Sequence, residues 1–222
     1  MLSEAVSAWG GGELEPLEDT HEFAIPDSVG SRTSRGLVLR TIFTPGHTPD
    51  HCAFLLSSAD QQANTDSEIQ EPILFTGDAV LGHGTAVFED LAVYVSSLEK
   101  MLGVVGQVNA HYKQSGSSVR VKAYPAHGEV IPDAEAKLRE YIDHRAQREK
   151  EVVDVLRRQN RQEGMTAMGI VKIIYQDYPE SLHGPAEGGL KLTLKKLLGE
   201  RKVSVDKDEK WKLVEGEVKA WL

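Results

Sequence analysis

The sequence has a single cysteine, fewer basic than acidic residues and no long apolar run. With only Cys52 available, an internal disulfide is excluded and a reducing compartment is indicated. The 25 Lys and Arg residues against 34 Asp and Glu residues give a net charge of -9, which disfavours nucleic-acid binding but leaves room for a local basic patch. No run reaches the roughly 18 apolar residues of a membrane span, and the N-terminus has no signal-like pattern. We therefore expect a cytoplasmic protein with no membrane partner.

The length of 222 residues fits one domain with an appendage, or two small domains. An apolar fraction of 40% and a charged fraction of 27% are usual for a globular protein. The residue pattern of the chain changes after about residue 160. We therefore predict a main domain over residues 1–160 and a separate C-terminal domain over residues 161–222.

The main domain is predicted to be rich in β-strands, with polar or weakly patterned segments between them. Residues 1–35 are read as loop with at most one short helix or strand, residues 57–72 as an exposed loop, and residues 104–119 as a poorly patterned insertion. An amphipathic helix is expected over residues 90–101. The predicted strands are residues 37–43, 52–56, 73–77 and 119–124.

The chain after residue 133, which includes the end of the main domain and the C-terminal domain, is predicted to be helical and to end in a hairpin. A long charged helix follows Asp133 as N-cap and runs to about Arg158, and Thr166 caps a shorter helix. Pro185 is placed at the start of another helix that runs through Leu198. With two short strands at residues 203–205 and 211–213, the order of helix, helix and hairpin resembles a winged-helix unit.

Three turns carry metal-competent side chains, each where an apolar strand gives way to a glycine turn. They are Thr44-Pro45-Gly46-His47-Thr48, Thr76-Gly77-Asp78 and Ala126-His127-Gly128. Taken singly, each polar side chain is more often a cap for local backbone. In combination, His47, Asp78 and His127 are ligands able to converge on a divalent ion, which predicts the metal site of a hydrolase.

Three further histidines, the cysteine and one arginine are also considered as functional residues. His51 is read as a second-sphere or packing residue, and His83 as a residue facing substrate or as a loop histidine in solvent. His183, near Pro185, is a candidate to line a cleft between the tail and the core. Cys52 is read as a small buried hydrophobic residue, and Arg145 as part of a solvated helix face.

The three metal motifs resemble the later motifs of the metallo-β-lactamase superfamily. The segments 84–91, 141–145 and 170–212 narrow the similarity to the β-lactamase-like protein 2 group, which includes animal mitochondrial endoribonucleases and fungal thioesterases of the atrochrysone carboxyl carrier-protein type. The similarity runs from about residue 36 to residue 213. It implies an α/β fold, the αββα sandwich, with a winged-helix-like C-terminal appendage.

The resemblance also implies two Zn²⁺ ions, with His47, Asp78 and His127 as ligands and Asp78 as the bridging, catalytic carboxylate. The superfamily's His-x-His-x-Asp-His motif is absent from residues 1–46, where His21 is the one histidine. We therefore expect an N-terminally incomplete sandwich with an uncovered apolar sheet face. The chain is read as a fragment or truncated gene product of a complete enzyme, or as an inactive paralogue.

Three functions follow from this reading. The first is zinc-dependent thioester hydrolysis that releases an aromatic polyketide from the acyl carrier protein of a polyketide synthase, because the loop at residues 82–90 is more similar to the fungal form. The second is cleavage of single-stranded RNA in mitochondria, with backbone contacts from the lysines of the tail, Lys172, Lys191, Lys195 and Lys196. The third is a non-catalytic interaction protein that binds no metal.

Overall fold

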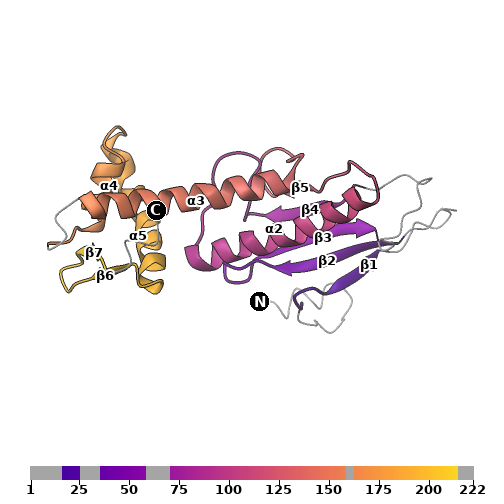
Figure 1. Ribbon diagram of the computed structural model, residues 1–222, viewed down its shortest axis with the longest axis horizontal. Helices are drawn as coiled ribbons and strands as arrows, with labels where there is room; N and C mark the ends of the chain where they lie inside the picture. Colours follow the sequence, from indigo (N-terminus) through magenta and orange to yellow (C-terminus); the bar gives the residue numbers. More distant parts are fainter. Residues whose placement is uncertain (1–16, 26–35, 59–70, 159–162, 215–222) are drawn as a thin grey trace, which may run out of the picture.

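The computed structural model describes residues 17–25, 36–58, 71–158 and 163–214 (Figure 1). The predicted strands and helices are largely confirmed. The elements, in chain order, are β1 (Glu22–Ile25), β2 (Leu37–Phe43), β3 (Cys52–Ser58), β4 (Ile73–Gly77), α2 (Leu91–Gln114), β5 (Lys122–Pro125), α3 (Ala134–Arg158), α4 (Ala167–Ile174), the 3-10 helix η1 (Glu180–Leu182), α5 (His183–Gly199), β6 (Val203–Val205) and β7 (Trp211–Leu213).

The five strands of the main part form one mixed sheet in the order β1-β2-β3-β4-β5. The first three pairings are antiparallel, and β4 pairs with β5 in parallel after the chain crosses over through α2. β1 is the short strand allowed within the first 35 residues; the predictions for residues 1–16 and 26–35, and for most of the 57–72 loop, lie outside the described residues.

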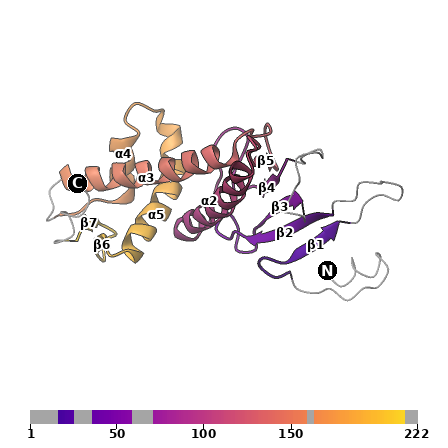
Figure 2. The same ribbon diagram turned by 45° about the vertical axis from the view of Figure 1, so that its right-hand side comes forward.

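One face of the sheet is covered by α2 and α3, which lie together along it (Figures 1 and 2). The strands turn their alternate residues toward these helices, and the side chains there are at most 2% exposed: Ile42, Ala53, Leu55, Leu74 and Ala123. Leu98 and Met101 of α2 meet them from the helix side and are fully buried. This cluster is the main core of the molecule.

The opposite face of the sheet is apolar and exposed, as expected for an uncovered sandwich layer. The large side chains on it are 37–41% exposed: Phe23, Ile25, Phe43, Phe75 and Tyr124. The strand registers place them in neighbouring rows, and the Phe75 and Tyr124 rings lie 5.9 Å apart. Apolar area of this kind normally marks a surface that another layer or partner covers.

The reading of residues 104–119 as an insertion was wrong, because α2 continues to Gln114. Gly103 and Gly106 weaken the helical pattern there. Val105 is nevertheless fully buried, and Val108 packs against the main core. Burial of these valines outweighs the roughly 1 kcal/mol by which each glycine disfavours a helix relative to alanine.

The C-terminal helices and hairpin have a second buried cluster of their own, centred on Ile170, Val171 and Leu194. α3 runs from the sheet to these helices and contributes to both clusters (Figure 2). Asp133 and Thr166 cap α3 and α4 as predicted, by accepting hydrogen bonds from Ala136 N and Gly169 N. α5 begins at His183, two residues before the predicted start. The domain boundary at residue 160 stays a prediction.

Within the described residues, no helix combines the length and the apolar character required to cross a bilayer.

Tyr94 anchors the start of α2 in the core, and it gives a prediction for alkaline pH. Its side chain is fully buried, and its hydroxyl donates to Ala79 O at 2.6 Å. Burial raises the pKa of Tyr94 to about 12. The unfolded tyrosine ionises near pH 10 while the folded one stays protonated, so this contribution to stability is complete below about pH 10 and falls by up to about 2 kcal/mol as the pH rises toward 12.

Tyr94→Phe should therefore lower the free energy of unfolding by about 1–2 kcal/mol at neutral pH, because it removes one hydrogen bond. It should also flatten the alkaline decline. Urea unfolding at several pH values between neutrality and pH 11 measures both effects, and an unchanged alkaline slope in the variant would contradict the assignment.

Candidate metal site

The loop that carries His47 is bound to the start of α2. Gly46 has a φ of +123°, and a Cβ at this position would lie 2.4 Å from Tyr94 N and Cα, so the loop passes directly over the helix backbone. Gly46 O accepts hydrogen bonds from Glu89 N at 2.8 Å and Asp90 N at 3.2 Å. These contacts fix the residue next to His47, and only glycine fits there.

Asp78 follows a second left-handed glycine at the end of β4. Gly77 has a φ of +53°, and a Cβ there would lie 2.6 Å from His51 Nε2. Thr76 Oγ1 donates to Val80 O at 2.8 Å, and Ala79 N donates to Thr76 O at 3.1 Å. The turn is thus held on both sides of Asp78.

His127 lies in a turn that packs against the segment after Asp78. Gly82 N donates to His127 O at 2.9 Å. A Cβ on Gly82 would lie 2.2 Å from Glu129 N and O, and one on Gly128 would lie 2.8 Å from His83 N. The two loops therefore approach backbone to backbone, which brings His127 next to Asp78.

The structure brings the three predicted ligands together. His47 Nε2 lies 4.0 Å from Asp78 Oδ2, and His127 Nε2 lies 3.4 Å from Asp78 Oδ1. The side chains are 19%, 40% and 72% exposed for His47, Asp78 and His127, so the group opens to solvent on the His127 side.

The geometry differs from three ligands around one ion. Each histidine faces a different oxygen of Asp78, so the side chains form two pairs that share the carboxylate. Consistently, no group of three or more His, Cys, Asp and Glu side chains within the described parts of the chain is arranged to hold a single metal ion. Since zinc sites usually have about four ligands, a pair supplies only part of one.

The hydrogen bond of His47 indicates how its ring is protonated. Nδ1 lies 2.8 Å from Val87 O, and a carbonyl oxygen only accepts, so Nδ1 carries the proton. When Nε2 carries no proton, its lone pair faces the Asp78 carboxylate across a 4.0 Å gap. Two acceptors facing one another repel, and a cation between them removes the repulsion. The donors therefore fit a metal, with further ligands still required.

His51 and His83 lie beside this group. His51 Nδ1 is 2.8 Å from Thr44 Oγ1 and 3.1 Å from Thr44 O, and its ring lies edge-on to His47 at 5.7 Å. Burial, followed by the neighbouring His47, lowers the pKa of His51. His83 is exposed, and its Nδ1 lies 2.6 Å from the position of a Cβ on Gly128.

His183 is placed elsewhere, at the start of α5. Its Nε2 lies 3.2 Å from Tyr175 O, and its side chain is 9% exposed. These contacts make it a packing residue of the C-terminal helices, and the structure does not bring it to Asp78. Cys52 is half-buried on the exposed sheet face, where burial raises the pKa of its thiol.

The reading of Arg145 as part of a solvated helix face was wrong. Its Nη2 donates to Ala86 O at 3.0 Å, and its guanidinium lies 4.8 Å from the centre of the Phe88 ring. Sequence reasoning also missed the Val87 carbonyl that holds His47. A backbone oxygen leaves no trace in the sequence, but the spacing of Tyr141 and Arg145 on one face of α3 was a usable signal for the arginine.

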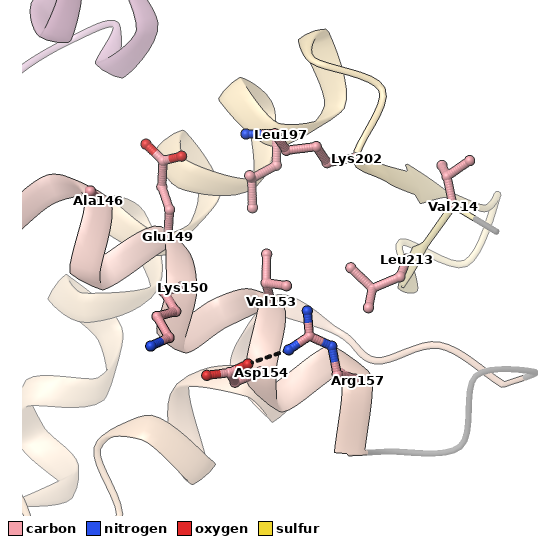
Figure 3. A pocket seen from close by; sticks show the side chains of 10 residues that line it. All are labelled: Ala146, Glu149, Lys150, Val153, Asp154, Arg157, Leu197, Lys202, Leu213 and Val214. Atoms are coloured by element: carbon pink, nitrogen blue, oxygen red, sulfur yellow. Dashed lines mark hydrogen bonds and ion pairs between the residues drawn. The ribbon is translucent and has the colours of Figure 1, made fainter. Parts of the chain in front are cut away.

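One apolar hollow lies away from this group. A pocket of about 280 Å³ between α3, α5 and β7 is lined by Val153, Leu197 and Leu213, with the Asp154–Arg157 ion pair at its edge (Figure 3). It shares no lining residue with the His47, Asp78 and His127 group, so it has no part in the candidate site.

The comparisons with known proteins concern the family and the fold. Residues 166–211 match the family described as the beta-lactamase associated winged helix domain. Over 196 residues the chain is 35% identical to the "Beta-lactamase-like protein 2 homolog" of Drosophila melanogaster. This match covers 88% of this chain and 54% of the Drosophila protein. The chain belongs to the metallo-β-lactamase superfamily.

Other superfamily members are similar over the same extent. The chain is 35% identical over 192 residues to the "Atrochrysone carboxyl ACP thioesterase" of Aspergillus chevalieri, covering 84% of this chain and 52% of that protein. A β-lactamase domain protein from Burkholderia ambifaria matches with a TM-score of 0.61 at 18% identity, over 92% of this chain and 53% of that one.

These matches confirm the metallo-β-lactamase fold with a C-terminal winged helix. The chain spans about half the length of the curated relatives it matches.

Proposed function

We propose that this chain carries part of the active site of a metal-dependent hydrolase, with His47, Asp78 and His127 as ligands of two zinc ions. The observation that supports this most directly is the placement of two imidazole Nε2 atoms opposite the two oxygens of Asp78, at 4.0 and 3.4 Å. A carboxylate shared by two imidazoles would suit a pair of ions, which His47 and Asp78 would hold on one side and His127 and Asp78 on the other, with Asp78 as the catalytic carboxylate. The remaining ligands would come from water or from residues other than these three.

The chemistry that zinc supplies in such sites is acidification of water to a hydroxide nucleophile and polarisation of the attacked carbonyl. The chain's own residues orient and fix the donors. Val87 O holds the His47 ring, the Gly77 turn presents Asp78, and the Gly82–Gly128 approach places His127. His51, bonded to Thr44, fills the space behind Gly77.

For the substrate we propose the thioester of an aromatic polyketide held on an acyl carrier protein, hydrolysed in the cytoplasm. The support is the similarity to a fungal protein named as an acyl carrier protein thioesterase. Val87, which adjoins the His47 contact, is 73% exposed and offers an apolar surface beside the site for an acyl group.

Three of the four lysines proposed to track an RNA backbone form ion pairs within the chain. Lys191 pairs with Glu187, Lys195 with Asp90, and Lys196 with Glu149 and Glu200. Their charge is thus partly neutralised, and with a net charge of -9 the molecule offers little attraction for phosphate. We therefore favour the thioester as substrate over single-stranded RNA.

The test is turnover of an acyl thioester by the 222-residue chain supplied with zinc. We expect zinc-dependent release of free thiol, measured with a thiol-reactive dye, and loss of that release in Asp78→Asn. Asp50→Asn is the matched control, since Asp50 is an exposed acid in the loop that carries His47, and its carboxylate accepts a hydrogen bond from Thr48 Oγ1.

Three results would contradict the proposal in different ways. Zinc binding without thioester turnover would reject the thioesterase but keep the metal site, and zinc-dependent cleavage of single-stranded RNA would favour the ribonuclease. Absence of bound zinc would favour a non-catalytic interaction protein.

A further inference from the structure

Arg145 of α3 holds the chain on both sides of Val87, the residue whose carbonyl contacts His47. Its Nη2 donates to Ala86 O at 3.0 Å, and its guanidinium lies over the Phe88 ring at 4.8 Å. Val87 itself is 73% exposed, so its own side chain does little to fix the backbone. The direction of the Val87 carbonyl is therefore set by its two neighbours, and both are in contact with Arg145.

The same cluster reaches the residues that follow Asp78. Phe88 stacks on Tyr94 with ring centres 5.2 Å apart, and Arg145 lies 5.7 Å from the Tyr94 ring. The Tyr94 hydroxyl donates to Ala79 O, one residue after Asp78. The guanidinium thus sits at the centre of contacts that reach the backbone on the Asp78 side and on the His47 side of the site.

The chemistry of arginine suits this place. The Nε of Arg145 is buried and, among the described residues, has no hydrogen-bond partner. A guanidinium that has lost part of its water is attracted more strongly to aromatic faces and to a carbonyl oxygen. It stays charged at all relevant pH values, and its planar shape allows stacking on a ring and donation to a carbonyl at once.

We propose that Arg145 is a positioning residue: it fixes the Val87 carbonyl and thereby holds the His47 ring with Nδ1 protonated and the Nε2 lone pair directed at Asp78. The effect of Arg145 on metal binding rests on the proposed function, whereas its effect on the orientation of the His47 ring does not. Without Arg145, residues 86–88 lose two anchors, the 2.8 Å contact of His47 Nδ1 with Val87 O weakens, and the other tautomer becomes accessible.

The test is nitrogen NMR of histidine-labelled 222-residue chain without metal, at an alkaline pH where imidazoles are neutral. The wild type should show His47 with an unprotonated Nε2, and Arg145→Ala should show a mixture of tautomers. Arg148→Ala is the control, because Arg148 lies on the same helix but pairs with Glu151 and lies over the Tyr175 ring. It should keep the wild-type tautomer.

A second readout is zinc affinity measured by calorimetry, which Arg145→Ala should lower by about 10-fold, as expected for loss of a residue that orients a ligand. An unchanged His47 tautomer in folded Arg145→Ala would overturn the proposal. If that variant does not fold, Arg145→Lys decides, since lysine keeps the charge but cannot stack and donate at once. A second tautomer there supports the role, and a single wild-type tautomer overturns it.

The two proposals fail separately. If the wild type binds no zinc, the proposed function is lost, and the tautomer comparison still decides the role of Arg145. If zinc affinity and tautomer are both unchanged in Arg145→Ala, the metal site stands and the positioning role does not.

Discussion

Asp78→Asn is expected to lower the zinc affinity of the chain by at least about 100-fold, because loss of even an orienting residue typically costs 10–100-fold. The carboxylate supplies one oxygen toward His47 and the other toward His127, so its loss affects both pairs at once. An amide keeps the shape but has no charge, and only one of its two terminal atoms is a ligand. Isothermal titration with zinc measures the effect.

The control for this variant is Asp50→Asn, which removes one negative charge from the loop that carries His47. Asp50 is exposed, and its carboxylate accepts a hydrogen bond from Thr48 Oγ1. It should bind zinc as the wild type does. Equal affinities for the two variants would show that zinc binds by general charge attraction and that the three side chains are not its ligands.

Gly46→Ala is expected to lower the free energy of unfolding by about 4 kcal/mol, from a strained backbone angle and from overpacking. The φ of +123° is one that alanine rarely adopts, and the new methyl group would lie 2.4 Å from Tyr94 N and Cα. Backbone atoms of a helix cannot move aside as a flexible side chain can. Urea unfolding followed by circular dichroism measures the loss.

Gly103→Ala is the matched control for that variant. Gly103 lies within α2, and a Cβ added there meets nothing within 4 Å. Alanine should stabilise the helix by about 0.5–1 kcal/mol, because it loses less backbone freedom on folding. If Gly46→Ala were as stable as Gly103→Ala, the close approach of the His47 loop to α2 would not exist in solution.

Much of the fold was predictable because short-range chemistry determines it. β2, β3 and β4 are largely apolar, and β2 and β4 contain β-branched residues. Each of the three turns that carry His47, Asp78 and His127 contains a glycine within three residues of the end of a strand. The N-caps Asp133 and Thr166 were likewise visible in the sequence, since their side chains bond backbone only a few residues away.

The misses have a common physical origin in contacts between distant segments. The length of α2 depends on Val105 packing into a core that forms only in the folded state. Gly103 and Gly106, judged by local propensity alone, indicate that the helix ends before them. Arg145 is half-buried because Ala86 and Phe88, almost sixty residues earlier, lie under it. Its spacing of four residues from the buried Tyr141 was the one local signal that separated this arginine from its neighbours on a highly charged helix.

The pairing of the two histidines with separate oxygens of Asp78 could not be predicted from the sequence either. Motif order shows which residues meet, but the division into His47 with Oδ2 and His127 with Oδ1 depends on angles set by the Gly77 and Gly128 turns. That division is the basis for proposing two ions, one on each side of the carboxylate, in place of a single ion held by all three side chains.

Diffraction from crystals of the 222-residue chain soaked in zinc, recorded at the zinc absorption edge, tests the central claim most directly. We predict an anomalous peak about 2.0–2.2 Å from an Asp78 oxygen, with His47 Nε2 or His127 Nε2 as a second ligand. A peak bound by other side chains alone, or no peak between Asp78 and either histidine, would contradict the metal site.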